Sequence, residues 1–156
     1  MTRPVRETGR REEPIAPKKR TMNENNYCFE LEMKVRDYEC DMQGIVNNAN
    51  YQHYLEHARH EFLQQAGTGF TCLREKGIEP VVSRIEIDYK NSLHSQDVFT
   101  CKLYIRKEGI KFVFYQDIYR SSDNKLCAKG RVETVCIHNG RLSRGEELVP
   151  FFEKYL

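Results

Sequence analysis

Several features that mark other protein classes are missing from this sequence of 156 residues. It has no tryptophan, no apolar run long enough to span a membrane, and no apolar segment near its start that would indicate a secretory signal. Its six cysteines show no Cys-x-x-Cys pairing, which argues against a disulfide framework and against a zinc site. We therefore expect a cytoplasmic protein whose cysteines serve as small hydrophobic residues.

The low net charge of +2 conceals an uneven distribution. Residues 1–21 contain seven Lys or Arg and three Glu, a net of +4, so the remainder of the chain carries −2. This segment is rich in proline and poor in apolar residues, which is typical of disorder. A basic arm for nucleic acid or membrane is one interpretation, but no aromatic residue interleaves with the charges. We expect residues 1–26 to be a disordered basic extension that binds neither, and residues 27–156 to form one domain.

Hydrophobic periodicity predicts one strand, one long helix and four further strands. Apolar and charged residues alternate over 29–35, and apolar residues at 3,4 spacing over 51–66 indicate an amphipathic helix that ends at Gly67. A short helix is expected over 70–76. The remaining expected elements are strands over 85–89, 99–105, 112–119 and 126–137, and a short helix over 151–155.

Short, turn-rich connections between the later strands favour an antiparallel sheet. One face of such a sheet needs a cover, and the long helix is the segment able to provide it. The sequence therefore predicts an α+β domain. Because one helix leaves the sheet edges open, we also expect a homo-oligomer.

The segment from Asp41 to Tyr51 reads Asp-Met-Gln-Gly-Ile-Val-Asn-Asn-Ala-Asn-Tyr and joins the first strand to the long helix. Gly44 permits a tight turn, after which the helix start can present free N–H groups to an oxyanion. Asp41 can then act on an electrophile or on a water molecule. On the residues alone, a structural interpretation is favoured over this catalytic one: Asp41 completes a turn and the asparagines cap the helix.

Charged residues of the helix and strands offer further candidates. His53, Glu56 and His57 match the H-x-x-E-H string of inverted zinc peptidases. A helical wheel, however, places these histidines and His60 opposite the apolar stripe, so we expect them to face solvent and we expect no metal site. Glu56 and Arg59 can form a surface ion pair, which their spacing favours, or line a groove beside the sheet.

Basic residues lie at or near the ends of the expected strands. Most such residues are simply solvated, but a phosphate-bearing ligand would need some of them, because the folded part is not basic overall. The residues concerned are Arg84, Lys90, Arg106, Lys107 and Lys111.

The segments 36–51 and 54–59 resemble the signature of acyl-CoA thioesterases of the 4-hydroxybenzoyl-CoA thioesterase type. The resemblance implies the hotdog fold, in which a five-stranded antiparallel sheet wraps a long helix. It also implies an acyl-CoA thioesterase in which Asp41 is nucleophile or general base and the backbone N–H of Asn48 polarises the thioester carbonyl. Tyr51 and Glu56 complete the catalytic candidates.

The same resemblance implies an active site at the interface of a homodimer or homotetramer, without a metal or any cofactor beyond the coenzyme A of the substrate. Basic side chains bind the coenzyme A phosphates in this family, which makes Arg84, Lys107 and Lys111 the candidates here.

Two departures from related proteins narrow this interpretation. Many relatives carry His at the position of Asn48, so an imidazole is excluded there. Plant acyl-ACP thioesterases place catalytic Asn and His where this chain has Gln43 and Ile45, so hydrolysis of acyl-ACP by their route is not expected. The main alternative is a non-catalytic acyl-CoA or acyl-carrier-protein binding protein of the same fold, and a hotdog dehydratase is a weaker one. Asp41 favours the enzyme.

Overall fold

The computed structural model describes residues 26–156, and residues 1–25 of the expected extension lie outside the described residues. Its elements are β1 (Phe29–Lys34), α1 (Asn48–Gln65), α2 (Phe70–Glu75), β2 (Ile78–Tyr89), β3 (Val98–Glu108), β4 (Lys111–Arg120), β5 (Leu126–His138), β6 (Arg141–Leu142) and α3 (Val149–Phe152). No helix within residues 26–156 combines the length and the hydropathy of a membrane span.

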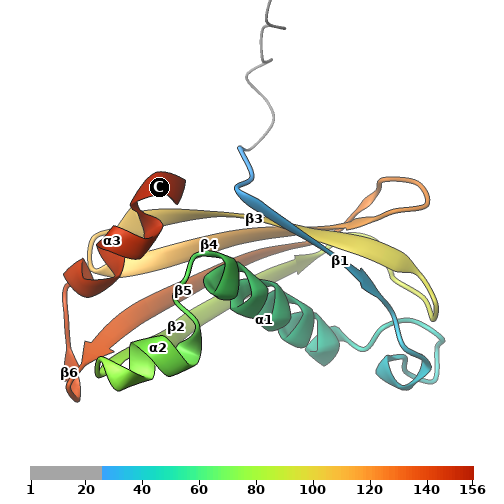
Figure 1. The fold of residues 1–156 in the computed structure, drawn as a ribbon. Coiled ribbons are helices and arrows are strands. Elements are labelled where there is room, and N and C mark those ends of the chain that lie inside the picture. The colour runs from blue at the N-terminus through green and yellow to red at the C-terminus, as the bar shows by residue number, and fades with distance from the viewer. Residues whose placement is uncertain (1–25) are drawn as a thin grey trace, which may run out of the picture.

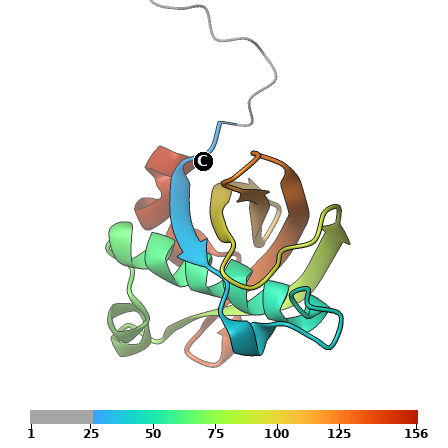
Figure 2. The same cartoon turned by 90° about the vertical axis from the view of Figure 1, so that its right-hand side faces the viewer.

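The strands form one antiparallel sheet in the order β1-β3-β4-β5-β2, with the two-residue β6 beside β5. The sheet curls around α1, which lies across its concave face (Figure 1). Figure 2 shows the same helix nearly from the side, with β1 crossing it. The predicted α+β arrangement is therefore confirmed, and β1 and β2 form the two outer edges of the sheet.

Helix α1 begins and ends where its sequence specifies. The side chain of Asn47 caps its start by accepting the N–H of Ala49 at 3.0 Å, and Gly67 follows its end with a φ of +76°. A Cβ atom built on Gly130 of β5 would lie 2.6 Å from Cδ1 of Leu55. Glycine at that position therefore lets the helix lie directly against the sheet.

The core is a cluster of aromatic and aliphatic side chains between α1 and the sheet. Phe62 is at its centre: its ring stacks on Phe152 at 6.0 Å and meets Phe29 and Phe114 edge to face. Burying a ring of this size stabilises the fold by about 3–5 kcal/mol relative to alanine. The C-terminal α3 thus covers the end of the core that α1 leaves open.

The largest departure from the sequence-based prediction is β2. It begins at Ile78, seven residues before the expected start, and includes Pro80 and a register shift between Val82 and Arg84. A proline has no N–H to donate, and an outer strand tolerates it because one side of that strand has no partner among residues 26–156. Four consecutive residues of β2, from Val81 to Arg84, are exposed, so this part of the strand lacks the alternation of buried and exposed residues that β1 and β3 show.

Candidate active site

The loop before α1 is folded around Asp41. Its N–H donates to the carbonyl of Ile45 at 2.9 Å, its carbonyl accepts the N–H of Gly44 at 3.0 Å, and its Oδ1 accepts the N–H of Gln43 at 2.8 Å. Gly44 has a φ of +78°, which a side chain would disfavour. One carboxylate oxygen is thereby held by the turn, while Oδ2 has no hydrogen-bond partner among residues 26–156.

The buried carboxylate of Glu39 holds this loop against the helix. It accepts the hydroxyl of Tyr54 at 2.6 Å and the backbone N–H of Arg36 at 2.9 Å. Its own carbonyl accepts the N–H of Asn47 and the side-chain Nδ2 of Asn50. Burial, together with this hydrogen bond, raises the pKa of the Tyr54 hydroxyl above its ordinary value, so it remains a donor. Sequence reasoning missed Glu39; the one available signal was a tyrosine on the buried stripe, whose hydroxyl requires a partner.

The first turn of α1 leaves one backbone donor free. The N–H of Ala49 donates to the side chain of Asn47, and that of Asn50 donates to the carbonyl of Asn47. The N–H of Asn48 has no acceptor among residues 26–156. The hydroxyl of Tyr89, at the end of β2, donates to the carbonyl of Asn48 at 3.0 Å and ties the helix start to the sheet edge. A free N–H at a helix N-terminus attracts negative charge.

Asp41, Asn48 and Tyr51 all line one open cavity of about 300 Å³, here called the Asp41 cavity, together with Tyr89 and Lys90. Tyr51 is buried, and this burial raises the pKa of its hydroxyl to about 12, so the ring lines the cavity in neutral form. Three of the four predicted catalytic residues are thus brought together. The lining combines an acidic residue, the first residue of the helix and a lysine.

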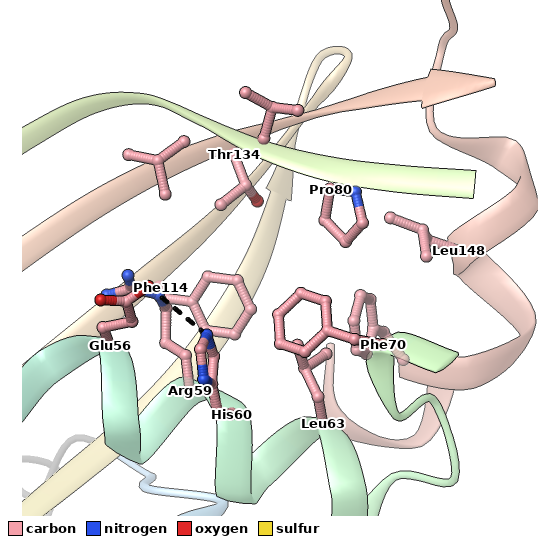
Figure 3. Close-up of a pocket in the computed structure, with 12 residues that line it drawn as sticks. Glu56, Arg59, His60, Leu63, Phe70, Pro80, Phe114, Thr134 and Leu148 are labelled. Atoms are coloured by element: carbon pink, nitrogen blue, oxygen red, sulfur yellow. Dashed lines mark ion pairs between the residues drawn. The ribbon is translucent and has the colours of Figure 1, made fainter. Parts of the chain in front are cut away.

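The fourth candidate, Glu56, lies elsewhere, at a second cavity of about 290 Å³ between α1 and the sheet. This space, here called the Arg59 cavity, is mainly apolar, with Leu63, Phe70 and Phe114 among its lining residues. Figure 3 shows Glu56, Arg59 and His60 along its helical wall and Pro80 and Thr134 across from them.

Two expectations about the helix surface change at this cavity. Arg59 is 7% exposed and makes no ion pair with Glu56 within 4.0 Å, so the alternative of a groove beside the sheet holds and the surface pair does not. His53 and His57 are exposed as predicted, whereas His60 is only half-exposed and packs edge to face on Phe70 at 4.6 Å, so for His60 the prediction holds only in part. The reason is α2, which packs against the side of α1 that a helical wheel of α1 alone assigns to solvent.

The predicted coenzyme A contacts lie outside the Asp41 cavity. Arg84 forms an ion pair with Glu86, Lys111 forms one with Glu133, and Lys107 donates to two backbone carbonyls. Lys90 does line the cavity. The sequence indicated it only as one of the basic residues near strand ends that a phosphate-bearing ligand could use. The role of Arg84, Lys107 and Lys111 in binding coenzyme A stays a prediction. No group of three or more His, Cys, Asp or Glu within the described part of the chain is placed to hold a metal ion.

Comparison with known proteins places this geometry in a family. Residues 35–154 match the model of the thioesterase-like superfamily. The chain belongs to this superfamily. The match covers both cavities and every element from the loop before α1 to α3, and it confirms the predicted thioester hydrolase class.

Individual relatives agree with this family. An acyl-CoA thioesterase of Haemophilus influenzae is 27% identical over 123 residues, 78% of this chain and 88% of that protein. A chloroplastic acyl-acyl carrier protein thioesterase of Arabidopsis thaliana is 41% identical over 104 residues, 65% of this chain but only 55% of that longer protein. A solved structure of a hypothetical protein from Aquifex aeolicus superposes with a TM-score of 0.73 at 30% identity, covering 79% of this chain and 98% of its own. The predicted hotdog fold is confirmed.

Proposed function

We propose that this thioesterase hydrolyses acyl-CoA to a free acid and coenzyme A, with Asp41 and the N–H of Asn48 as its catalytic groups. The observation that carries the proposal is that Asp41, whose Oδ2 is free, and Asn48, whose helix N–H is free, line the same cavity. The name of the Haemophilus influenzae relative supports acyl-CoA as the substrate class.

The chemistry needs few groups because a thioester carbonyl is electrophilic and its thiolate leaves readily. In the proposed reaction Asp41 removes a proton from water as the water oxygen bonds to the carbonyl carbon. The N–H of Asn48 stabilises the resulting oxyanion, which is worth on the order of 3 kcal/mol in the transition state. The tetrahedral intermediate then collapses, the C–S bond breaks, and the coenzyme A thiolate leaves and takes up a proton. In the second route that the same geometry allows, Asp41 attacks the carbonyl carbon, the C–S bond breaks as the coenzyme A thiolate leaves, and water then hydrolyses the mixed anhydride to the free acid and Asp41.

We further propose that two copies of the chain pair through β2. The outer side of β2 has no partner strand among residues 26–156, and it exposes Val81 and Val82, which are 44% and 41% exposed. Exposed edge strands of this kind are templates for pairing. In an antiparallel pair of identical strands the two-fold axis lies near the strand centre, at Ser83 and Arg84.

This pairing has a consequence for the site. Pro80, Val81 and Val82 border the Arg59 cavity, whereas Tyr89 at the other end of β2 borders the Asp41 cavity. A two-fold axis near the middle of β2 therefore sets the Asp41 cavity of one chain beside the Arg59 cavity of the other. The acyl group of a thioester bound at Asp41 then enters the Arg59 cavity of the second chain, next to its Glu56.

The proposed hydrolysis needs few groups beyond those already named. The proposal needs no metal and no cofactor apart from the coenzyme A of the substrate, whose phosphates we assign to Lys90 and to the predicted Arg84, Lys107 and Lys111. All six cysteines are free, and three of them are buried, which supports the expected cytoplasmic location.

Release of free thiol from a panel of acyl-CoAs tests the activity, with Asp41→Ala as the paired variant. We expect turnover by the natural chain, and a loss of at least about 10²-fold in the variant at an unchanged melting temperature. Acyl-ACP substrates in the same assay test the class named for the Arabidopsis thaliana relative. Tight binding of acyl-CoA without any thiol release would instead identify the non-catalytic alternative.

Sedimentation velocity tests the pairing. Val81→Lys combined with Val82→Lys puts charge on the outer edge and should yield monomers. Val98→Lys, at an exposed valine on the inner strand β3, is the matched control and should sediment as the natural chain does. Equal sedimentation of all three proteins as dimers would place the interface elsewhere.

A further inference from the structure

Arg59 is unusual among the charged residues of this protein because it is buried without a carboxylate partner. It is 7% exposed, and no carboxylate oxygen lies within 4.0 Å of its guanidinium nitrogens among residues 26–156. Buried arginines are normally paired, because removing a charge from water is costly. Burial lowers the pKa of Arg59 below its ordinary value, as expected for an uncompensated cation.

One part of the guanidinium is fixed by a neutral partner. Nη1 donates to Oε1 of Gln116 at 2.9 Å, and Nε2 of Gln116 donates to the carbonyl of Leu55 at 2.9 Å. Gln116 is completely buried on β4, so this chain of hydrogen bonds fixes the orientation of the Arg59 head group. A guanidinium carries five N–H donors, and one acceptor satisfies only part of them.

The remaining donors face the Arg59 cavity. No fully buried side-chain nitrogen or oxygen lacks a partner within the described residues, so the N–H groups of Arg59 that have none remain accessible. Arg59 lines the cavity with the ring of Phe114 beside it and Pro80 across from it (Figure 3). The cavity thus presents oriented hydrogen-bond donors within an apolar enclosure.

We infer that the Arg59 cavity selects acyl groups that carry a neutral acceptor oxygen, such as a hydroxyl or an oxo group, along the chain, and that Arg59 is the residue that recognises it. This inference rests on the proposed thioesterase function. A plain hydrocarbon chain fills the cavity, removes its water and leaves the guanidinium donors unpaired, whereas an oxygenated chain pairs them. Sites built to bind a hydroxyl discriminate against analogues that lack it for this reason.

The charge around the cavity favours a neutral oxygen over a carboxylate. Glu56 lies outside ion-pair distance of Arg59, yet its negative charge acts on the guanidinium. His60, the other titratable group on this wall, has its pKa lowered by burial and is neutral near pH 7. A carboxylate would have to lose its water in this apolar space beside Glu56, whereas a hydroxyl or oxo oxygen pairs the Arg59 donors at a smaller desolvation cost.

Matched substrate pairs test the inference. Hexanoyl-, octanoyl- and decanoyl-CoA are each compared with the ω-hydroxy form, and suberoyl-CoA serves as the carboxylate analogue of the octanoyl pair. We expect kcat/KM to favour the hydroxylated member of at least one pair by about ten- to hundredfold. In Arg59→Met this ratio should fall to about one or below, largely because the plain substrate is hydrolysed faster. Arg74→Met, at an exposed arginine on α2, should leave the ratio unchanged.

Two further measurements keep the test decisive. If Arg59→Met fails to fold, the double variant Arg59→Met, Gln116→Met removes both hydrogen-bond partners together and restores an apolar core. Dissociation constants measured on Asp41→Ala give the same ratio without turnover, so a failure of catalysis is distinguished from a failure of selection. Preference for the plain acyl group in every pair, a stronger preference for suberoyl-CoA, or an unchanged ratio in a folded Arg59→Met variant would each overturn the inference.

Discussion

The two cavities on α1 differ in almost every physical respect. The Asp41 cavity is the more open and the more polar of the two and lies at the helix N-terminus, where the N–H of Asn48 is free. The Arg59 cavity lies against the second half of the helix, is walled by aromatic and aliphatic side chains, and contains one buried cation. Asn48 and Arg59 are eleven residues apart, roughly 16 Å along the helix axis.

This contrast separates chemistry from recognition. Groups at the Asp41 cavity act on the thioester, which every acyl-CoA shares, whereas groups at the Arg59 cavity meet the part in which acyl-CoAs differ. A change at the first should therefore affect all substrates alike, and a change at the second should affect their ranking. Substitutions at each cavity and at the groups that position it test this division.

Asp41→Asn should lower kcat by about 10³-fold for every acyl-CoA in the panel, because it removes the only proposed base. The ratio between plain and hydroxylated substrates should stay as in the natural chain. Steady-state kinetics across the panel measures both quantities. Glu61→Gln, the same carboxylate-to-amide change at an exposed position of α1, is the control and should retain full activity. An altered ratio in Asp41→Asn would mean that the two cavities are not separate in function.

Mixed dimers test whether one substrate uses cavities of two chains. Asp41→Asn and Arg59→Met chains are co-expressed with different affinity tags, so that dimers of each kind can be isolated. All activity of a purified mixed dimer comes from its one intact Asp41. If one substrate uses both chains, that Asp41 works with the intact Arg59 of the other chain, and the mixed dimer should keep the natural preference for the hydroxylated substrate. If Asp41 and Arg59 of the same chain served one substrate, the only active site would carry the Arg59→Met substitution, and the preference should be lost as in Arg59→Met alone.

Tyr54→Phe should reduce kcat by about tenfold and the free energy of unfolding by about 1–3 kcal/mol, because it withdraws a donor from the buried Glu39 carboxylate. The loop that carries Asp41 then loses one of its attachments to the helix. Urea unfolding and thiol release measure the two effects. Tyr38→Phe removes a hydroxyl from a side chain that is 79% exposed and should change neither. Loss of stability at full kcat would show that Glu39 supports the fold without positioning Asp41.

The smallest expected effect concerns pH and His60. Burial lowers the pKa of His60 in the folded protein below its ordinary value of about 6.5, so the unfolded chain takes up a proton first as the pH falls. Its contribution to stability is present above about pH 6.5 and is lost below it. The drop in melting temperature between pH 7.5 and 5.5 should be smaller in His60→Gln than in the natural chain. His57→Gln, at an exposed histidine of the same helix, should show the full drop.

The sequence predicted those elements in which the spacing of apolar residues shows which side chains are buried. The stripe through Tyr51, Leu55 and Phe62 specifies α1, and β1 and β3 show alternation because one face of each strand meets the core and the other does not. The first half of β2 could not be predicted, because Pro80 argues against a strand and only its outer position makes proline acceptable.

Only the part of the site whose residues lie close together in the sequence was predictable. Asp41, Gly44 and Asn48 lie within eight residues, so one motif contains them all. Arg59 and Gln116 are 57 residues apart and meet only after the sheet has curled around the helix. On a helical wheel Arg59 lies on the flank of the stripe, where the degree of burial depends on a neighbouring element that the wheel does not include.

The close approach of α1 to the sheet at Gly130 also bears on how this protein can evolve. Any side chain at Gly130 would meet the end of the buried Leu55 side chain, which would have to move, and the helix that carries Leu55 also carries the Asn48 donor and the Arg59 head group. Substitutions that shift the helix are therefore disfavoured in evolution, because they would alter catalysis and recognition at the same time. New acyl preferences are instead expected to arise on the opposite wall, at Val82, Thr134 and their neighbours, where substitutions leave the catalytic end of the helix in place.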